Sequence, residues 1–364
     1  MILRIIILFI IVFPFQNTFG QKKEVQYSFF TAGHTYGNPN SPQLGLLPSF
    51  LDYLPQLNSN PKMELAFLTG DFVQSPTIEN YDAAQNDLDR FEMPYYIAAG
   101  NHDISPEFES RFNNYYLSFK HHEDLFILLT PGLNQWNIEG EQLAFLEEIL
   151  EQNASESRHI FIILHELIWW SPTNIFKNVK INWEPHYPGS TNYEETVKPL
   201  LESYPNQVFI YAGDLGCVSN VSPCMYYQNN NIHLIASGMG SGTKDNIIIT
   251  EISEQGVYLN LIALNGNNQN AMGELTSWAV NLSIAKIDNN APMIYPNPSS
   301  GIIHIQNIAS VDTITIYNSA GEHIKTYSDI SKGIDVSFLN NGIYIIEITS
   351  NKEQYYRKLL IQYN

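Results

Sequence analysis

Seven short apolar segments follow one another between residues 27 and 240, and this succession restricts the chain to a few fold classes. The segments are rich in β-branched and aromatic residues, and their apolar runs are long enough for strands that are buried on both faces of a sheet. Helical patterns lie between several of them, for example "EGEQLAFLEEILEQ" at residues 139–152. The pattern predicts an α/β domain. The segments are "YSFFTAG", "ELAFLTGD", "YYIAAGNHD", "LFILLT", "HIFIILHE", "VFIYAGD" and "IHLIASGMG".

Several of these predicted strands end in a residue that can bind a metal ion or carry a proton. In open α/β sheets, loops converge at the carboxyl ends of the strands, and sites are built there on a rigid platform. Each residue alone has an ordinary explanation, because Gly-Asp is usually a turn and a histidine at a strand end is often a core or capping residue. Their coincidence favours a functional site made of His34, Asp71, Asn101, His102, His165 and Asp214.

Five motifs in a fixed order connect these residues to a known family: "LTGDFVQS", "AAGNHD", "GEQLAFLEEIL", "ILHELIWW" and "YAGD". With them, residues 27–264 resemble the calcineurin-like metallophosphoesterase superfamily. The resemblance implies a four-layer α-β-β-α sandwich in which two β-sheets are flanked by helices. It also implies two metal ions above the strand ends and a hydrolase that acts on phosphate esters.

The resemblance assigns roles to individual residues, with two departures. Ala32 and Gly216 stand where the family has ligands of the first ion, so that ion keeps only His34 and a share of Asp71. Asp214 stands where the family has a histidine, and it is either a ligand or only a turn carboxylate. The resemblance therefore implies one divalent ion, with Asp71, Asn101, His165 and Asp214 as metal ligands and His102 and His34 as catalytic proton carriers.

The identity of the ion and the activity of the site both stay open at this level. Carboxylate, amide and imidazole groups suit Mn²⁺, Mg²⁺, Fe²⁺ or Zn²⁺. One ion can polarise a phosphoryl oxygen, but it cannot clamp both the attacking and the leaving oxygen. We expect a metal-dependent phosphoesterase because His102 is retained. The alternative is a non-catalytic metal-containing protein that binds glycans or phosphorylated polymers at the cell surface.

A loop rich in aromatic residues lies between two ligand-bearing strands, at residues 166–193. Rings at this place can stack on a sugar or base, or they can simply pack the loop against the domain. Trp169, Trp170 and His186 are candidates for the substrate cleft, and His186 is also a remote candidate for a replacement ligand of the first ion.

The amino-terminal sequence and the composition indicate an exported protein. Residues 1–20 have one arginine, an apolar run and small residues at the end, which predicts a signal peptide for export to the periplasm. No segment is long enough to predict a transmembrane helix. With 18 basic against 37 acidic residues and no basic cluster, we expect no nucleic-acid partner. In an exported protein the close pair Cys217 and Cys224 predicts a disulfide, which we favour over a zinc site.

The last part of the chain has a different pattern, with short alternating strands and Gly- or Asn-containing turns. This pattern predicts a small all-β sandwich at residues 292–364. "YPNPSSG", "VDTITIYNSAGEHI" and "LNNGIYIIEI" resemble the type IX secretion sorting domain of Bacteroidetes. The resemblance implies the type IX secretion machinery as a partner and a secreted or outer-surface location. The predicted division is 1–20 signal peptide, 21–275 metallophosphoesterase-like domain, 276–291 linker and 292–364 sorting domain.

Overall fold

The computed structural model describes residues 24–363 except for 113, 183–190, 241, 265–271, 281–291, 307, 309, 319–322, 329–332 and 351–352. The predicted signal peptide, His186 and most of the predicted linker lie outside the described residues. The chain forms two compact units, Met1–Ala279 and Val280–Asn364. The four segment boundaries expected from the sequence remain predictions.

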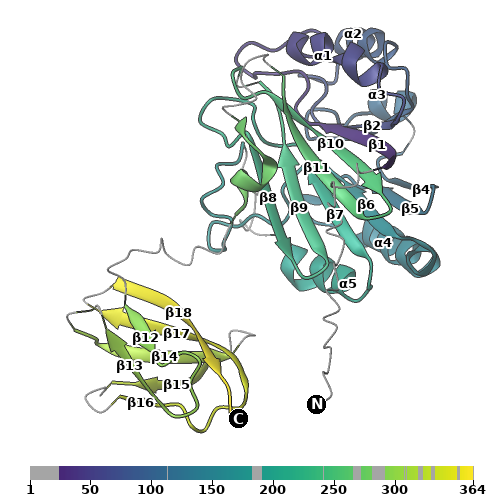
Figure 1. Ribbon diagram of the computed structural model, residues 1–364. Coiled ribbons are helices and arrows are strands. Elements are labelled where there is room, and N and C mark those ends of the chain that lie inside the picture. Colours follow the sequence, from purple (N-terminus) through teal and green to yellow (C-terminus); the bar gives the residue numbers. More distant parts are fainter. Residues whose placement is uncertain are drawn as a thin grey trace, which may run out of the picture. The chain divides into compact units, whose positions relative to one another are not determined.

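Two β-sheets form the centre of the first unit (Figure 1). The first sheet has the order β11-β10-β1-β2-β3, and β1, β2 and β3 run parallel. The second has the order β4-β5-β6-β7-β9-β8, with β5, β6, β7 and β9 parallel and an antiparallel strand at each edge. The strands are β1 Val25–Ala32, β2 Met63–Thr69, β3 Tyr95–Ala98, β10 Asn246–Ser253 and β11 Gly256–Ala263 in the first sheet, and β4 Leu117–His121, β5 Asp124–Leu128, β6 His159–Ile163, β7 Gln207–Ala212, β8 Cys224–Asn229 and β9 Ile232–Ser237 in the second.

Neighbouring residues of β1 show how the layers are stacked. The Phe29 ring lies between the two sheets, with its centroid 5.3 Å from that of Phe126 and 5.1 Å from that of Phe161. Phe30 points to the other face of the first sheet, where it packs with Phe50 of α1. Successive strand residues alternate between faces, so β1 is buried on both sides. The predicted α/β class with two sheets is confirmed. The helices are α1 Pro48–Asn58, α2 Ile78–Leu88, α3 Pro106–Phe112, α4 Gly140–Asn153 and α5 Lys198–Glu202, with short helical turns η1 Pro131–Asn134, η2 Ala154–Glu156, η3 Tyr193–Val197 and η5 Leu275–Trp278.

Glycines bring the ends of the central strands into direct backbone contact. A Cβ atom on Gly213, just after β7, would lie 1.8 Å from the carbonyl oxygen of Thr69 at the end of β2. A Cβ atom on Gly238, just after β9, would lie 1.9 Å from the carbonyl oxygen of Leu215. No other residue type fits at such contacts. The loops that follow β2 in one sheet and β7 in the other therefore meet at one edge of the domain.

The second unit is all-β and consists of antiparallel sheets, which confirms the predicted second fold class. Its core is made of isoleucine and leucine side chains such as Ile303, Ile314, Ile346 and Leu359. None of the helices in the described part of the chain is long and apolar enough to cross a bilayer. The strands are β12 Met293–Tyr295, β13 Ile302–Gln306 and β16 Ile334–Asp335 in one sheet, and β14 Thr313–Asn318, β15 His323–Tyr327, β17 Gly342–Ser350 and β18 Glu353–Ile361 in the other.

Candidate metal centre

Four polar side chains converge where the strands of the two sheets end, and each is at most 1% exposed: His34, Asp71, His165 and Asp214. They follow β1, β2, β6 and β7 respectively. His34 Nε2 lies 3.6 Å from Asp71 Oδ2, and His165 Nε2 lies 3.4 Å from Asp71 Oδ1 and 3.8 Å from Asp214 Oδ1. Ligand atoms of His34, Asp71 and Asp214 all lie within 4.8 Å of one another.

Backbone hydrogen bonds set which nitrogen of each imidazole faces this cluster. His34 Nδ1 lies 2.8 Å from the carbonyl oxygen of Gly37, and His165 Nδ1 lies 2.8 Å from the carbonyl oxygen of Thr69. Because a carbonyl only accepts hydrogen bonds, Nδ1 carries the proton in both rings. In the neutral rings, Nε2 therefore presents a lone pair towards the carboxylates. This arrangement is typical of histidines that bind a metal through Nε2.

The unsatisfied atoms of the cluster fit a bound cation. His34 Nε2, Asp71 Oδ2, His165 Nε2 and Asp214 Oδ2 are buried and have no hydrogen-bond partner among the described residues. Buried polar atoms are normally paired, because an unpaired one costs about 1–3 kcal/mol. The separations of 3.4 to 3.8 Å between neighbouring donors are also close to the roughly 3.3 Å between ligands of a tetrahedral ion. These residues could hold one divalent ion.

The electrostatics of the cluster also favour a positive charge at its centre. Burial raises the pKa of Asp214 to about 6. Burial also opposes ionisation of Asp71, but His165 and His34 hold its pKa below the usual range. Burial lowers the pKa of His34 to about 4, whereas the carboxylates of Asp71 and Asp214 outweigh burial and raise the pKa of His165 well above 6.5. A positive charge beside the buried carboxylates therefore stabilises them, whether it is the protonated His165 ring or a bound cation.

Two of the cluster residues have unusual backbones. His34 has φ 55° and Asp71 has φ 50°, in the left-handed region that non-glycine residues rarely adopt. Such conformations cost about 1–3 kcal/mol and persist where surrounding structure holds them, often at functional sites. The backbone at both positions is thus shaped to aim the side chains into the cluster.

Asp103 holds this backbone in place, although it was not among the residues predicted for the site. Its buried carboxylate accepts backbone N–H bonds from Asp71 at 2.7 Å and Gly100 at 2.8 Å, and from Phe72 and Val73 at 3.1 and 3.3 Å. It therefore fixes the loops after β2 and β3 to each other. The signal was present in the sequence, because Asp103 is the last residue of "GNHD".

Glu166 is a second buried carboxylate that the sequence interpretation passed over. It directly follows His165, is 0% exposed, and neither of its oxygens has a hydrogen-bond partner among the residues that the structure describes. Burial raises its pKa to about 7. When it is ionised, its negative charge adds to that of the neighbouring Asp214 and Asp71 and further favours a cation in this region.

The residues expected from "GNHD" lie at the side of the cluster towards solvent. The backbone N–H of His102 donates to Asp71 Oδ1 at 3.2 Å, and His102 Nδ1 lies 2.6 Å from the carbonyl oxygen of Gln74. The half-buried His102 ring lies 5.4 Å from the ring of Tyr36. Asn101 is exposed, unlike the four buried side chains. The buried cluster thus consists of His34, Asp71, His165 and Asp214, and the ligand role expected for the exposed Asn101 stays a prediction.

Ala32 and Gly216, at which the resemblance implies that family ligands are absent, are both tightly packed. Ala32 is the last residue of β1 and lies in the apolar cluster under the helices of the first sheet. Gly216 has φ 71°, and a Cβ atom there would lie 2.3 Å from the carbonyl oxygen of Gly238. The backbone at Gly216 therefore excludes any side chain, whether or not a second ion binds.

The tryptophans predicted for the substrate cleft are instead interior packing residues. Trp169 is 1% exposed and its Nε1 donates to the Met225 sulfur at 3.4 Å, while Trp170 is 4% exposed and donates to the carbonyl oxygen of Val179 at 3.1 Å. Trp169 thus attaches the loop after β6 to β8, and Trp170 joins two parts of the loop to each other. The same loop reaches the cluster through Asn182, whose Nδ2 donates to Asp214 Oδ1 at 2.9 Å.

Cys217 and Cys224 are free in the structure, so the predicted disulfide is not formed here. Cys224 begins β8 and packs in the core between the sheets, whereas Cys217 follows Gly216 in the loop next to the cluster. Burial, together with the negative charge of Asp214, raises the pKa of the Cys217 thiol to about 12. A thiol in this environment stays protonated and unreactive at neutral pH.

Comparison with known proteins agrees with these features. Residues 34–238 match the family described as calcineurin-like phosphoesterase, and residues 293–362 match the secretion system C-terminal sorting domain. A probable cyclic nucleotide phosphodiesterase of Moraxella catarrhalis (strain BBH18) is 29% identical over 132 residues, which are 35% of this chain and 45% of that protein.

Two solved structures are also similar. A purple acid phosphatase from yellow lupin (Lupinus luteus) seeds is 14% identical with a TM-score of 0.49, over 67% of this chain and 52% of that one. A putative 5′-nucleotidase from Staphylococcus aureus is 11% identical with a TM-score of 0.34, over 69% of this chain and 58% of that one. This chain thus spans about half the length of the relatives that it matches.

The family match covers more than half of the chain, and it includes all four residues of the buried cluster. At the level of the family, the match supports a hydrolase of the phosphoesterase type that uses divalent metal. The match at residues 293–362 confirms the predicted sorting domain, which points to secretion or a surface location. The chain belongs to the calcineurin-like phosphoesterase family and carries a C-terminal secretion sorting domain.

Proposed function

We propose that this protein is a secreted or surface-displayed phosphoesterase that uses one divalent metal ion. The observation that carries the proposal is the convergence of four buried, unsatisfied ligand atoms at the strand ends, from His34, Asp71, His165 and Asp214. The choice of one ion rests on this closely spaced set and on Ala32 and Gly216, which supply no ligands. Mn²⁺, Mg²⁺, Fe²⁺ and Zn²⁺ remain the candidates, and the two imidazoles favour the transition metals.

Some residues of the chain position the ligands of the ion, and His102 transfers protons. When bound, the ion supplies Lewis-acid polarisation of a phosphoryl oxygen. Asp103 fixes the Asp71 loop through backbone bonds, and Asn182 fixes the carboxylate of Asp214. His102 keeps its Nδ1 proton on the carbonyl oxygen of Gln74, which leaves Nε2 to exchange a proton with the leaving oxygen of the ester.

The sorting domain supports the proposed location. Residues 293–362 match a secretion sorting domain, and we infer that they address the chain to the type IX secretion machinery after residues 1–20 direct it to the periplasm. The substrate is then a phosphate ester outside the cell. The relationship to a probable cyclic nucleotide phosphodiesterase makes a phosphodiester one of the substrates to be tried.

One observation favours the alternative, a metal-containing protein that binds glycans or phosphorylated polymers without turnover. The four ligand side chains are at most 1% exposed, which suits an ion that is held inside the fold for stability. In that case the ion would stabilise the loops that follow the strands. The retained His102, beside Asp71, favours the enzyme.

Metal analysis combined with turnover separates the two. Purified residues 21–364 are assayed on p-nitrophenyl phosphate, bis-p-nitrophenyl phosphate and a cyclic nucleotide, and metal is counted by mass spectrometry. We expect Asp71→Asn to lose both one equivalent of metal and activity, and His102→Ala to lose activity while it retains the metal. Metal without turnover on the whole panel would favour the binding protein. Unchanged metal content in Asp71→Asn would refute the site assignment.

A further inference from the structure

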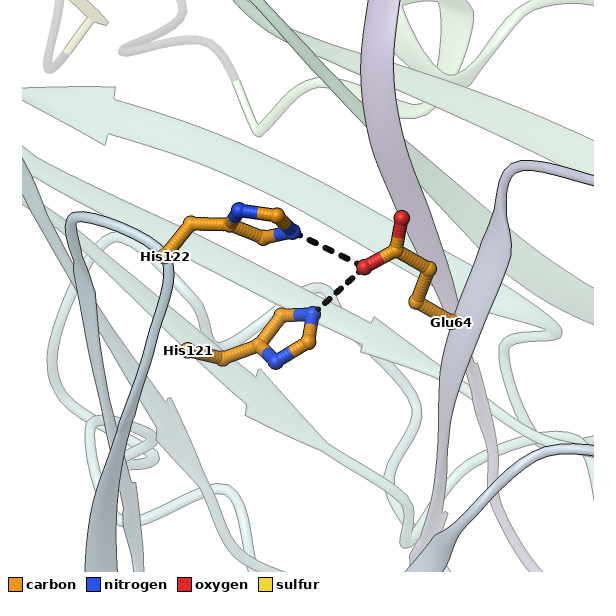
Figure 2. Close-up of side chains that lie close together, drawn as sticks. All are labelled: Glu64, His121 and His122. Atoms are coloured by element: carbon orange, nitrogen blue, oxygen red, sulfur yellow. Dashed lines mark hydrogen bonds and ion pairs between the residues drawn. The ribbon is translucent and has the colours of Figure 1, made fainter.

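A second group of potential metal ligands lies on the surface of the first unit (Figure 2). Nε2 of His121 lies 2.9 Å from Glu64 Oε2, and Nε2 of His122 lies 2.8 Å from the same oxygen. All three ligand atoms lie within 4.8 Å of one another. The side chains are 33% exposed for Glu64, 26% for His121 and 51% for His122. We call this group the surface triad.

The surface triad is separate from the buried centre. Glu64 is the second residue of β2, whereas Asp71 follows the last residue of the same strand. Seven residues of extended chain span roughly 23 Å. The triad therefore lies at the amino ends of the parallel strands, and the buried centre lies at their carboxyl ends.

The surface triad joins the two sheets. Glu64 belongs to the first sheet, while His121 ends β4 and His122 opens the turn to β5 in the second sheet. The imidazoles are 57 and 58 residues away from Glu64 in the chain. An ion held by all three side chains would connect one edge of the second sheet to the first.

The turn of the β4–β5 hairpin lets two consecutive histidines face one carboxylate. In an extended strand, neighbouring side chains point to opposite faces. His122 leaves this geometry with φ 51°, and both rings reach Glu64 from the same side (Figure 2). Non-glycine residues are uncommon in the left-handed region, and histidine is among the few types that are enriched there.

The Tyr27 ring packs against both imidazoles. Its ring stacks on His122 at 4.8 Å and 23°, and it meets the edge of His121 at 5.0 Å and 83°. The Tyr27 hydroxyl donates to Asp124 Oδ2 at 2.5 Å, and Asp124 also accepts from the His159 ring at 2.8 Å. The rings thus have fixed positions before a ligand binds, which lowers the entropic cost of binding.

We propose that Glu64, His121 and His122 bind a divalent transition-metal ion, with Zn²⁺ as the best fit. Two imidazole nitrogens and one carboxylate oxygen form a ligand set that zinc takes at open sites, with further positions left to water or another ligand. The nitrogen–oxygen separations of 2.8 and 2.9 Å need to open only to roughly 3.3 Å to surround such an ion. His122 also lines a cavity of about 560 Å³, so small molecules have access to this side of the triad.

The competing explanation is a polar surface contact without metal, in which each imidazole donates its Nε2 proton to Glu64. Zinc binding would require Nε2 of both imidazoles to give up this proton, since an imidazole coordinates through an unprotonated nitrogen. The two explanations differ in what they predict for added metal. Only a metal site takes up one equivalent of Zn²⁺ that depends on all three side chains.

A zinc titration of purified residues 21–364 tests the proposal. Zn²⁺ is titrated in competition with a chromophoric chelator, and the number and affinity of sites are compared between variants. His122→Asn removes the imidazole but suits the left-handed backbone, and Glu64→Gln keeps the size of the side chain. We expect each substitution to lower the affinity for one equivalent of Zn²⁺ at least ~10-fold. Phosphoesterase turnover and the metal of the buried centre should stay unchanged.

A matched control and a second readout keep the outcome interpretable. His304→Asn removes an exposed histidine of the second unit and should titrate like the wild type. Added Zn²⁺ should raise the melting temperature of the first unit in the His304→Asn protein by more than in the His122→Asn protein. Identical titrations for the wild type, His122→Asn and Glu64→Gln would overturn the proposal.

Discussion

Removal of the proposed ion from the buried centre is expected to destabilise the first unit strongly. Without it, four buried atoms lack a hydrogen-bond partner among the described residues: His34 Nε2, Asp71 Oδ2, His165 Nε2 and Asp214 Oδ2. At the low end of about 1 kcal/mol for each, the loss is about 4 kcal/mol. For a unit of this size, 1 kcal/mol shifts the melting temperature by about 2–4 °C, so we expect a fall of about 8–16 °C.

Differential scanning calorimetry measures this fall. The protein carries His122→Asn, so that the surface triad does not contribute, and it is scanned before chelation, after chelation and dialysis, and after Mn²⁺ or Zn²⁺ is restored. Only the transition of the first unit should move, and the transition of the sorting unit serves as an internal reference. Restored metal should return the transition to its original temperature.

A matched variant shows whether the effect belongs to the buried centre. Asp71→Asn removes a ligand that faces both imidazoles, so its melting temperature should no longer respond to the chelator. Two results would refute the reasoning. One is an unchanged melting temperature after the metal content has fallen to zero. The other is an equal fall in Asp71→Asn, which would place the responsible ion elsewhere.

Three further predictions concern single residues. Gly213→Ala should destabilise the first unit by about 1–3 kcal/mol in urea unfolding, because the new Cβ would lie 1.8 Å from the Thr69 carbonyl oxygen. Gly301→Ala, with nothing within 4 Å of its new Cβ, should behave like the wild type. If the site is catalytic, His102→Ala should lower kcat about 100-fold or more with the same metal content; equal kcat would exclude its role as a proton carrier. Burial lowers the pKa of His233 to about 4 from 6.5, so the unfolded chain binds its proton first as the pH falls. The free energy of unfolding should therefore decrease from pH 6.5 towards 4. In His233→Gln this decrease, measured by urea unfolding, should be smaller by about 1 kcal/mol. Parallel pH profiles of the two proteins would contradict this prediction.

Much of the fold was predictable because it depends on local sequence patterns. Continuous apolar runs such as that of β6 predict buried strands, and the alternation in the last part of the chain predicts an antiparallel sandwich. The position of polar residues at strand ends also predicts that Asp71, His165 and Asp214 lie at one edge of the domain, where the structure brings them together. The carboxyl ends of parallel strands meet at that edge by geometry.

The composition of the candidate site was less predictable, since spacing says where a residue lies but not where its side chain points. His34 and Asn101 both follow a strand, yet the left-handed backbone turns His34 into the cluster and Asn101 remains exposed. Trp169 and Trp170 lie in a loop, where aromatic rings often meet a ligand, but both are packed inside. Only contacts with distant residues decide such cases.

The sequence by itself determined the two fold classes, the family and the sorting domain, because each depends on periodicity or on motifs of a few adjacent residues. The tertiary structure alone decided the membership of the buried cluster, the packing that requires a glycine at Gly216, and the surface triad. In the triad, Glu64 lies in a strand of the first sheet, and His122, 58 residues away, lies in the β4–β5 turn of the second. Their contact results from the packing of one sheet on the other, and no local sequence pattern predicts it.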